Sequence, residues 1–326
     1  MEYTTKQRLR DAWPAVRVAI SVGMLAVLVT HVHLRSLLPG WRSSTVGWLA
    51  AAIAVTVGGI VLSAVRWQRV LFALDMPAPL PALVSHYFAG LFVGNFLPST
   101  VGGDVLRVTR LSAANGNAPD TFASVVLERL TGWIVLPVLT LAGLAVNPHL
   151  LHLKGAATHV AVLVSVTTLA LLAAVLFLAS HPAVGRRLAD NEGWLRFIRA
   201  VHVGLDRVKR DPVAAAQVLA AGFVYQLAVV LAAFLAGRAL QLGVGWTTML
   251  AFMPAVAILQ VLPITIGGLG VREGAFVLFL DKSGLGVTFS HAVALGLLIY
   301  GINLVASLAG APAFAVGSRA PARMAT

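Results

Sequence analysis

Long apolar segments separated by short basic ones make up most of this chain, and they restrict the folds open to it. Of the 326 residues, 59% are hydrophobic and only 11% are charged, whereas a soluble domain carries roughly 25% charged residues. Inside lipid, only structures that satisfy their own backbone hydrogen bonds can cross the hydrocarbon core. The apolar segments therefore predict an all-α polytopic membrane protein.

Six segments have the length expected of spanning helices, which is about 17–25 apolar residues. They are Val16–Leu34, Val46–Val65, Thr121–Val146, Thr158–Ala179, Val213–Leu240 and Val287–Val316. Two further apolar segments, Leu80–Leu111 and Thr247–Leu280, are interrupted by proline and glycine. Proline removes a backbone donor and glycine loosens the backbone, so neither segment is expected to form one regular helix. We predict about six spanning helices and two re-entrant hairpins, with eight spanning helices as the alternative.

The two interrupted segments carry copies of one motif, L-P-x-T-x-G-G-x-x-x-R, at Leu97–Arg107 and Leu262–Arg272. The matched residues are Pro98 and Pro263, Thr100 and Thr265, Gly102-Gly103 and Gly267-Gly268, and Arg107 and Arg272. We interpret them as an internal duplication whose prolines and glycines set the hairpin geometry. Three spanning helices separate the copies, so the hairpins face opposite sides, as an inverted-topology repeat requires. Such paired, interrupted segments point to the binding site of a transporter.

The chain is predicted to be a single membrane domain, residues 1–326, with approximate repeat halves 1–180 and 213–326. The halves are joined by a basic segment, residues 181–212. Its apolar residues recur at helical spacing: Trp194, Phe197, Ile198, Val201, Leu205 and Val208. This pattern predicts an amphipathic helix lying in the membrane interface, and a lipid-headgroup sensor is the more specific alternative.

The distribution of positive charge predicts the orientation. With the N-terminus inside, 18 of the 24 Lys and Arg residues fall in cytoplasmic segments, Arg66 and Arg129 among them, as the positive-inside rule requires. We therefore expect a multi-pass protein with both termini cytoplasmic. The net charge of +12 is assigned to an anionic lipid surface, because no basic block with interleaved aromatic residues indicates nucleic acid.

Charged residues at membrane depth are the candidate functional groups, because each costs about 2.5–3.5 kcal/mol to insert. The candidate substrate-binding residues are Arg107, Arg272, Glu128, Glu273, Asp104, Arg129, Thr100 and Thr265. Arg107 and Arg272 would grip an anionic headgroup, since guanidinium binds phosphate through two parallel hydrogen bonds. Glu128 and Glu273 would position them or carry protons. Alternatively, Arg107 with Asp104 and Arg272 with Glu273 only pair with each other and fix the hairpins.

Signals for metal, cofactor or catalysis are weak, and we expect none of the three. The pairs His31-x-His33 and His149-x-x-His152 lack an added carboxylate, and structural zinc sites need more ligands. Gly267–Gly270 lacks the Lys-Ser/Thr that follows the glycines of a phosphate loop.

Three runs together resemble the lysylphosphatidylglycerol synthase transmembrane-region family: Asn95–Arg107, Val126-Leu-Glu-Arg-Leu130 and Leu262–Glu273. The resemblance implies a flippase-type domain of the bacterial inner membrane with two re-entrant elements. In bifunctional members this domain moves an aminoacylated phospholipid between leaflets, and a C-terminal soluble domain makes that lipid. Because the chain stops at Thr326, we expect a stand-alone member without the synthase domain, and hence no aminoacyltransferase activity.

These observations lead to a lipid transporter or flippase as the first hypothesis. Its cargo would be an anionic, phosphate-bearing lipid or a polyprenyl-phosphate-linked intermediate, moved between leaflets. Two alternatives stay open: an intramembrane enzyme acting on lipid-linked substrates, and a non-transporting scaffold for a glycosyltransferase or synthase partner. The sequence leaves the lipid, the coupling ion and the oligomeric state open.

Overall fold

The computed structural model describes residues 43–96, 102–153, 155–180, 195–261, 265 and 268–315. The longer helices are α3 (Ser43–Ala73), α4 (Leu80–Phe96), α5 (Gly102–Asn115), α6 (Ala118–Val146), α7 (Ala157–Ser180), α9 (Leu195–Arg210), α10 (Pro212–Ala239), α11 (Trp246–Gln260) and α13 (Phe289–Ser307). Shorter pieces are η1 (Pro148–His152), α12 (Val271–Phe276), η2 (Val277–Asp281) and α14 (Gly310–Ala315). Over these residues the fold is helical and contains no strand, which confirms the predicted all-α class.

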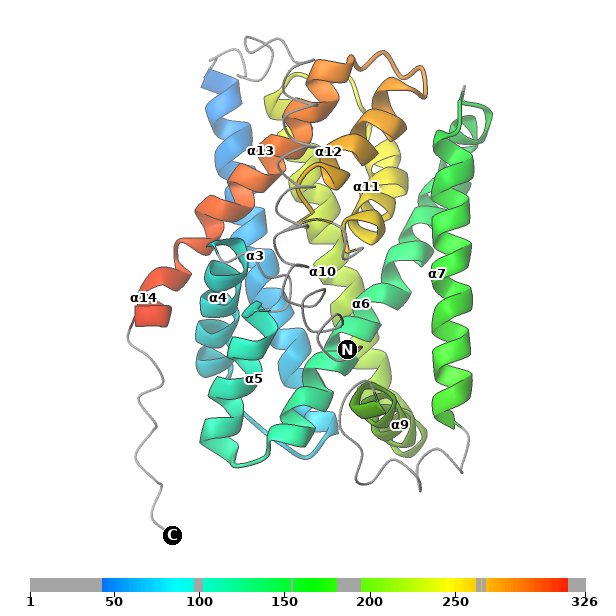
Figure 1. Ribbon diagram of the computed structural model, residues 1–326. Helices are drawn as coiled ribbons and strands as arrows, with labels where there is room; N and C mark the ends of the chain where they lie inside the picture. Colours follow the sequence, from blue (N-terminus) through cyan, green and yellow to red (C-terminus); the bar gives the residue numbers. More distant parts are fainter. Residues whose placement is uncertain are drawn as a thin grey trace, which may run out of the picture.

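Five of the described helices are long and apolar enough to cross a membrane: α3, α6, α7, α10 and α13. They match five of the six predicted spans. The remaining predicted span, Val16–Leu34, lies outside the described residues, so the total number of spans stays a prediction. The described helices therefore form a polytopic membrane bundle, seen from the side in Figure 1.

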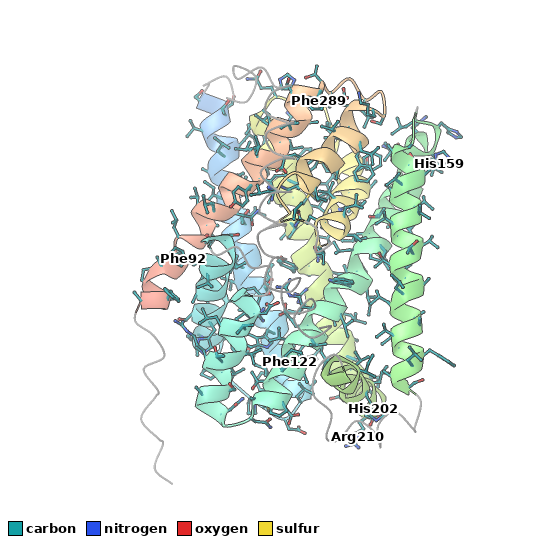
Figure 2. All side chains as sticks on the ribbon, in the orientation of Figure 1. Phe92, Phe122, His159, His202, Arg210 and Phe289 are labelled. Carbon is teal, nitrogen blue, oxygen red and sulfur yellow. The ribbon has the colours of Figure 1, made fainter. Side chains whose placement is uncertain are left out.

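Each interrupted segment forms two helices that double back on each other. The chain leaves the lower end of α3, rises through α4 and returns through α5 to the start of α6 (Figure 1). At the opposite end, it descends through α11 and returns through α12 and η2 toward the start of α13, where Phe289 lies in Figure 2. Each pair begins and ends at one end of the bundle, which is the arrangement that a re-entrant hairpin requires. The residues at the tips, 97–101, 262–264 and 266–267, lie outside the described part of the chain.

Small residues let the hairpins pack closely against the rest of the bundle. A Cβ added to Gly103 would lie 2.3 Å from the carbonyl oxygen of Gly90, so α5 contacts α4 backbone to backbone. A Cβ at Gly143 on α6 would lie 2.5 Å from the backbone nitrogen of Ala251 on α11. Close approach at glycine is the usual way in which helices associate in lipid. As a result, α6, which follows the first hairpin, packs against the second.

The last predicted span, Val287–Val316, is not one helix. It is broken after Ser307, and α14 begins at Gly310. Pro312 has no N–H to donate to the Leu308 carbonyl, so a continuous helix would lose a hydrogen bond there. A Cβ at Gly310 would lie 2.1 Å from the Phe88 carbonyl oxygen, so α14 can pack against α4 only through a glycine. The helix after the second hairpin thus contacts the first.

The basic segment between the predicted halves contains α9, which lies across the lower end of the bundle (Figure 1). Its residues His202 and Arg210 mark that end in Figure 2. Ile198 and Val201 are buried against α6 and α7, and a Cβ at Gly204 would lie 2.2 Å from the Leu127 side chain. An amphipathic helix therefore forms here. Residues 181–194 lie outside the described part of the chain.

Candidate functional site

A fully buried carboxylate, Glu128 on α6, joins four helices. Arg66 on α3 donates from Nη2 to its Oε1, and so does the hydroxyl of Tyr87 on α4, at 2.8 Å. Arg107 on α5 donates from Nη2 to Oε2 at 2.7 Å. A carboxylate buried without partners costs several kcal/mol, roughly what its removal from water requires. These contacts therefore hold the first hairpin against α3 and α6.

The guanidinium of Arg107 lies against two aromatic rings. Its Cζ lies 3.9 Å from the ring centroid of Tyr87 and 4.2 Å from that of Trp67, within the range of cation–π attraction. Trp67 is itself fixed by a hydrogen bond from Nε1 to the Ser124 hydroxyl, at 2.9 Å. Only 2% of Arg107 is exposed, so it clamps the hairpin in place.

A second carboxylate extends this cluster toward the surface. Asp104 accepts two hydrogen bonds from Arg129, at 2.9 and 3.0 Å, and a longer one from Arg107 at 3.3 Å. The Arg129 side chain is 55% exposed. Arg66, Arg107 and Arg129 thus share two carboxylates, which leaves this group with one excess positive charge.

The second hairpin builds its own charged pair within four residues of chain. Gly270, with φ of +84°, donates its N–H to Oε2 of Glu273 at 2.6 Å. Arg272 donates to Oε1 of the same carboxylate from Nη2 at 2.8 Å and from Nε at 3.1 Å. Glu273 is fully buried beside Gly296 of α13, where an added Cβ would lie 3.0 Å from its Cγ. This pair is neutral overall and lies in the first turn of α12.

A cavity of about 260 Å³ connects the two charged groups. Its described lining includes three arginines, Arg66, Arg129 and Arg272, and none of its described lining residues is Asp, Glu or His. Other polar or aromatic residues in the lining are Thr56, Ser63, Tyr87, Trp133, Tyr225, Gln226, Gln260 and Asn303. The carboxylates that pair with the arginines stay behind the cavity wall. Such a surface attracts an anion, because every charged side chain in the described lining is an arginine and the hydroxyl and amide groups beside them can donate hydrogen bonds.

Arg66 has hydrogen-bonding capacity left on this cavity. Its Nε and Nη1 atoms are buried and have no hydrogen-bond partner among the described residues. Gly132 on α6 keeps the adjacent space open, since a Cβ there would lie 3.3 Å from Arg66 Nη1 and 3.6 Å from Gln226 Nε2. Buried donors without partners are costly. A bound anion would satisfy them without displacing Glu128, which uses the other terminal nitrogen.

The predicted residues divide between the two groups. Arg107, Glu128, Asp104 and Arg129 lie together, and Arg272 and Glu273 lie in the second group. Of the two arginines expected at the anion, Arg272 lines the cavity, whereas Arg107 is not among its lining residues. Thr265 is 1% exposed and outside that lining. Thr100, Pro98, Pro263 and Gly267 lie outside the described residues.

Sequence reasoning missed Arg66 and Tyr87. Arg66 was expected in a cytoplasmic segment after a span ending at Val65, but α3 continues to Ala73 and buries it. A signal was present: Trp67, Val70 and Leu71 continue the apolar helical spacing beyond the arginine, and all three are buried. Both pairs named in the alternative are present, Arg107 with Asp104 at 3.3 Å and Arg272 with Glu273 at 2.8 Å. Arg107 lies closer to Glu128, at 2.7 Å, and Arg272 also lines the cavity.

Comparison with known proteins agrees with this architecture. The family described as Lysylphosphatidylglycerol synthase TM region matches residues 15–310, which is most of the chain. No curated protein matches the chain.

Proposed function

Because this chain belongs to the lysylphosphatidylglycerol synthase transmembrane-region family, we propose that it moves a phosphate-bearing lipid between leaflets. The family is a membrane domain associated with lipid flipping and transport. One observation carries the proposal: the cavity between the hairpins is lined by Arg66, Arg129 and Arg272, with no described acidic residue. The cargo is either an anionic phospholipid or a polyprenyl-phosphate-linked intermediate, since both present the same phosphate chemistry.

In this proposal the phosphate binds between the two hairpins. Arg66 offers Nε and Nη1, which have no described partner, and Arg272 faces the same space from the second hairpin. Guanidinium suits this task because its planar donors match two phosphate oxygens. A volume of about 260 Å³ lies just below the roughly 300–1,000 Å³ of drug-sized ligand sites, so it fits a headgroup and not a whole lipid.

The hairpins supply a route to alternating access. Each enters from its own end of the bundle (Figure 1), and each contacts the helix that follows the other, through α6 with α11 and α14 with α4. Each hairpin and the helix that packs against it would form one unit: the first hairpin with α14, and the second with α6. Rocking one unit relative to the other would open the cavity to one side at a time. Arg110 strengthens one such unit, since it donates to the Ala313 and Phe314 carbonyls of α14 at 2.9 and 3.1 Å.

We also propose that the lower end in Figure 1 faces the cytoplasm. The loop between α5 and α6 and the basic helix α9 lie there, as the positive-inside rule favours. The chain contains no cysteine, so single cysteines report on each side cleanly. In intact cells an impermeant maleimide should label His149→Cys in η1 and not Asn115→Cys at the end of α5. If only Asn115→Cys is labelled, the lower end faces the outside of the cell and the proposed orientation is wrong.

The direct test is lipid flipping by purified protein in liposomes. Fluorescent phosphatidylglycerol, reported by its accessibility to an impermeant quencher, should move at least about tenfold more slowly with Arg272→Gln or Arg66→Gln, since a lost charged hydrogen bond is worth roughly 1.5–3 kcal/mol. Arg238→Gln is the matched control, because Arg238 is exposed on α10 and outside the cavity lining. Correct folding is checked by size-exclusion chromatography and thermal unfolding.

Wild-type rates in both folded variants would remove the headgroup assignment. If wild-type protein flips neither phosphatidylglycerol nor a polyprenyl phosphate, the scaffold hypothesis replaces transport. The intramembrane-enzyme hypothesis needs a catalytic acid or base on the same cavity. Since the described lining holds no Asp, Glu or His, we do not propose it.

A further inference from the structure

A second cavity, of about 340 Å³, lies between α6, α7 and α11. From α7 it is lined by Leu163, Val164, Thr167, Thr168 and Leu171, and from α11 by Ile258 and Leu259. The described wall contains no charged side chain, and its polar residues are Thr167 and Thr168. The Thr168 hydroxyl already donates to the Val164 carbonyl at 2.7 Å. Such a wall cannot hold a headgroup, but it suits a hydrocarbon chain.

This apolar cavity adjoins the arginine-lined one. Trp133 and Leu136 on α6, and Val261 at the end of α11, line both cavities. Val261 directly precedes the second copy of the duplicated motif. The three side chains therefore form the junction between a cationic cavity and an apolar one. An occupant that fits both needs an anionic group at one end and an apolar chain at the other.

The apolar cavity also reaches the lipid-facing surface of the bundle. Leu163 and Leu171, which line it, are 64% and 62% exposed, and Trp133 at the junction is 40% exposed. On a spanning helix, side chains this exposed face the bilayer. The hydrocarbon chain of a lipid could therefore enter sideways from the membrane, between α7 and the pair formed by α6 and α11.

We propose that this cavity is the subsite for the hydrocarbon chain of the transported lipid, with Trp133 at the junction between chain and headgroup. The inference rests on the proposed function, because it takes the phosphate of the same molecule to lie among Arg66, Arg129 and Arg272. It adds a specificity: the cargo carries at least one long apolar chain, which stays against α7 while the headgroup crosses the bundle. Soluble phosphate esters would occupy only the cationic cavity.

The test uses the full chain in phosphatidylcholine liposomes and a phosphatidylglycerol with a photoactivatable diazirine on its acyl chain. After irradiation, adducts are mapped by peptide mass spectrometry. We expect them to concentrate on α6, α11 and the middle of α7, near Trp133. Leu171→Trp, which fills the cavity, should lower this labelling at least fivefold. Leu178→Trp is the matched control: Leu178 is also an exposed α7 leucine, 56% exposed, and it does not line the cavity.

A second measurement separates this inference from the proposed function. Glycerol 1-phosphate, which has no chain, should compete with the phosphatidylglycerol probe equally well in wild type and Leu171→Trp, and should lose its effect in Arg272→Gln. Competition that persists unchanged in Arg272→Gln would overturn the headgroup site. A different pair of results would overturn only the hydrocarbon-chain subsite. In that case competition depends on Arg272, but Leu171→Trp and Leu178→Trp are labelled equally.

Two further outcomes are decisive. Adducts spread evenly over the outer surface of α7 would mean ordinary contact with bulk lipid and would overturn the inference. A matched polyprenyl phosphate probe distinguishes the two sources of a phosphate with an apolar chain. Preferential, Leu171→Trp-sensitive labelling by either probe supports the subsite and identifies its occupant.

Discussion

The two hairpins carry the same motif, yet they use it differently. In the first, Gly102 and Gly103 already belong to α5, and Arg107 lies in the second turn of that helix. In the second, Gly268 and Gly270 have φ values of +72° and +84°, and α12 begins only at Val271. Arg272 therefore lies in a first turn. The same spacing in sequence thus places the two arginines at different points of a helix.

The cause lies in the positions between the shared residues. Val105 stands where the second copy has Gly270, and a valine cannot readily adopt the left-handed conformation that Gly270 shows. Asp104 stands where the second copy has Leu269, and an acidic residue in a first turn stabilises a helix N-terminus. The first copy therefore favours an early helix and the second an extended turn.

The difference in backbone produces a difference in role. Arg107 reaches across to Glu128 on α6 and lies against two aromatic rings, so it acts as a clamp. Arg272 pairs with its own neighbour Glu273 and lines the cavity. On the first hairpin's side, the cavity-facing arginines are Arg66 of α3 and Arg129 of α6, and neither is part of the motif. A duplicated motif therefore need not supply two equivalent binding groups.

The largest effect is expected at the centre of the clamp. Glu128→Gln removes the carboxylate that pairs with Arg66 and leaves Arg107 only its longer contact with Asp104. Breaking a buried ion pair costs about 3–5 kcal/mol. Thermal unfolding in detergent should show a large fall in Tm. Asp281→Asn is the control, because its partner Lys282 is 65% exposed, and exposed pairs contribute about 0–1 kcal/mol. Equal Tm values for the two variants would show that Glu128 does not hold the bundle together.

Matched substitution of the two motif arginines tests the comparison itself. Arg107→Gln should lower the free energy of unfolding, and with it the Tm. The loss should lie near the lower end of about 3–5 kcal/mol, because Glu128 keeps Arg66 and Tyr87 as partners. Arg272→Gln should lower the Tm less and reduce lipid flipping more, since Glu273 keeps the N–H of Gly270. Tm and flipping rate are measured on the same preparations. The reverse ranking would assign the clamp to the second hairpin.

Close packing within the first hairpin predicts a smaller effect. A Cβ at Gly90 would lie 2.9 Å from the Gly103 carbonyl oxygen, and overpacking of this kind costs about 1–3 kcal/mol. Gly90→Ala should therefore lower the Tm. Gly94→Ala, one turn further along α4, is the control, because its nearest atom would be 4.0 Å away. If both variants behave alike, the approach of α4 to α5 does not depend on glycine.

The smallest effect is expected from the turn of the second hairpin. Gly270→Ala places a Cβ in a left-handed conformation, which costs about 1–2 kcal/mol. Gly274→Ala, inside α12 with no atom within 4 Å of an added Cβ, should instead gain roughly 0.5–1 kcal/mol from the entropy of glycine. Opposite shifts in Tm are the expected outcome. A neutral Gly270→Ala would mean that the turn can relax to negative φ.

The sequence by itself determined the helical class, the position of five described spanning helices and the two interrupted segments. These features follow from local composition: apolar length sets the spans, and proline and glycine set the breaks. The sequence also identified several charged residues as candidates for the site: Glu128, Asp104, Arg129, Arg272 and Glu273. A charged side chain in an apolar segment needs a partner in any folded structure, so such residues stand out in the sequence.

Only the tertiary structure decided which charges face the cavity. Arg66 and Arg69 resemble the end of a span, yet α3 continues past both, because Arg66 meets a carboxylate 62 residues away in Glu128. Arg107 matches Arg272 in sequence, but helix packing turns it toward that same carboxylate. Burial of a charge depends on partners that come from distant segments, and local spacing carries no record of them.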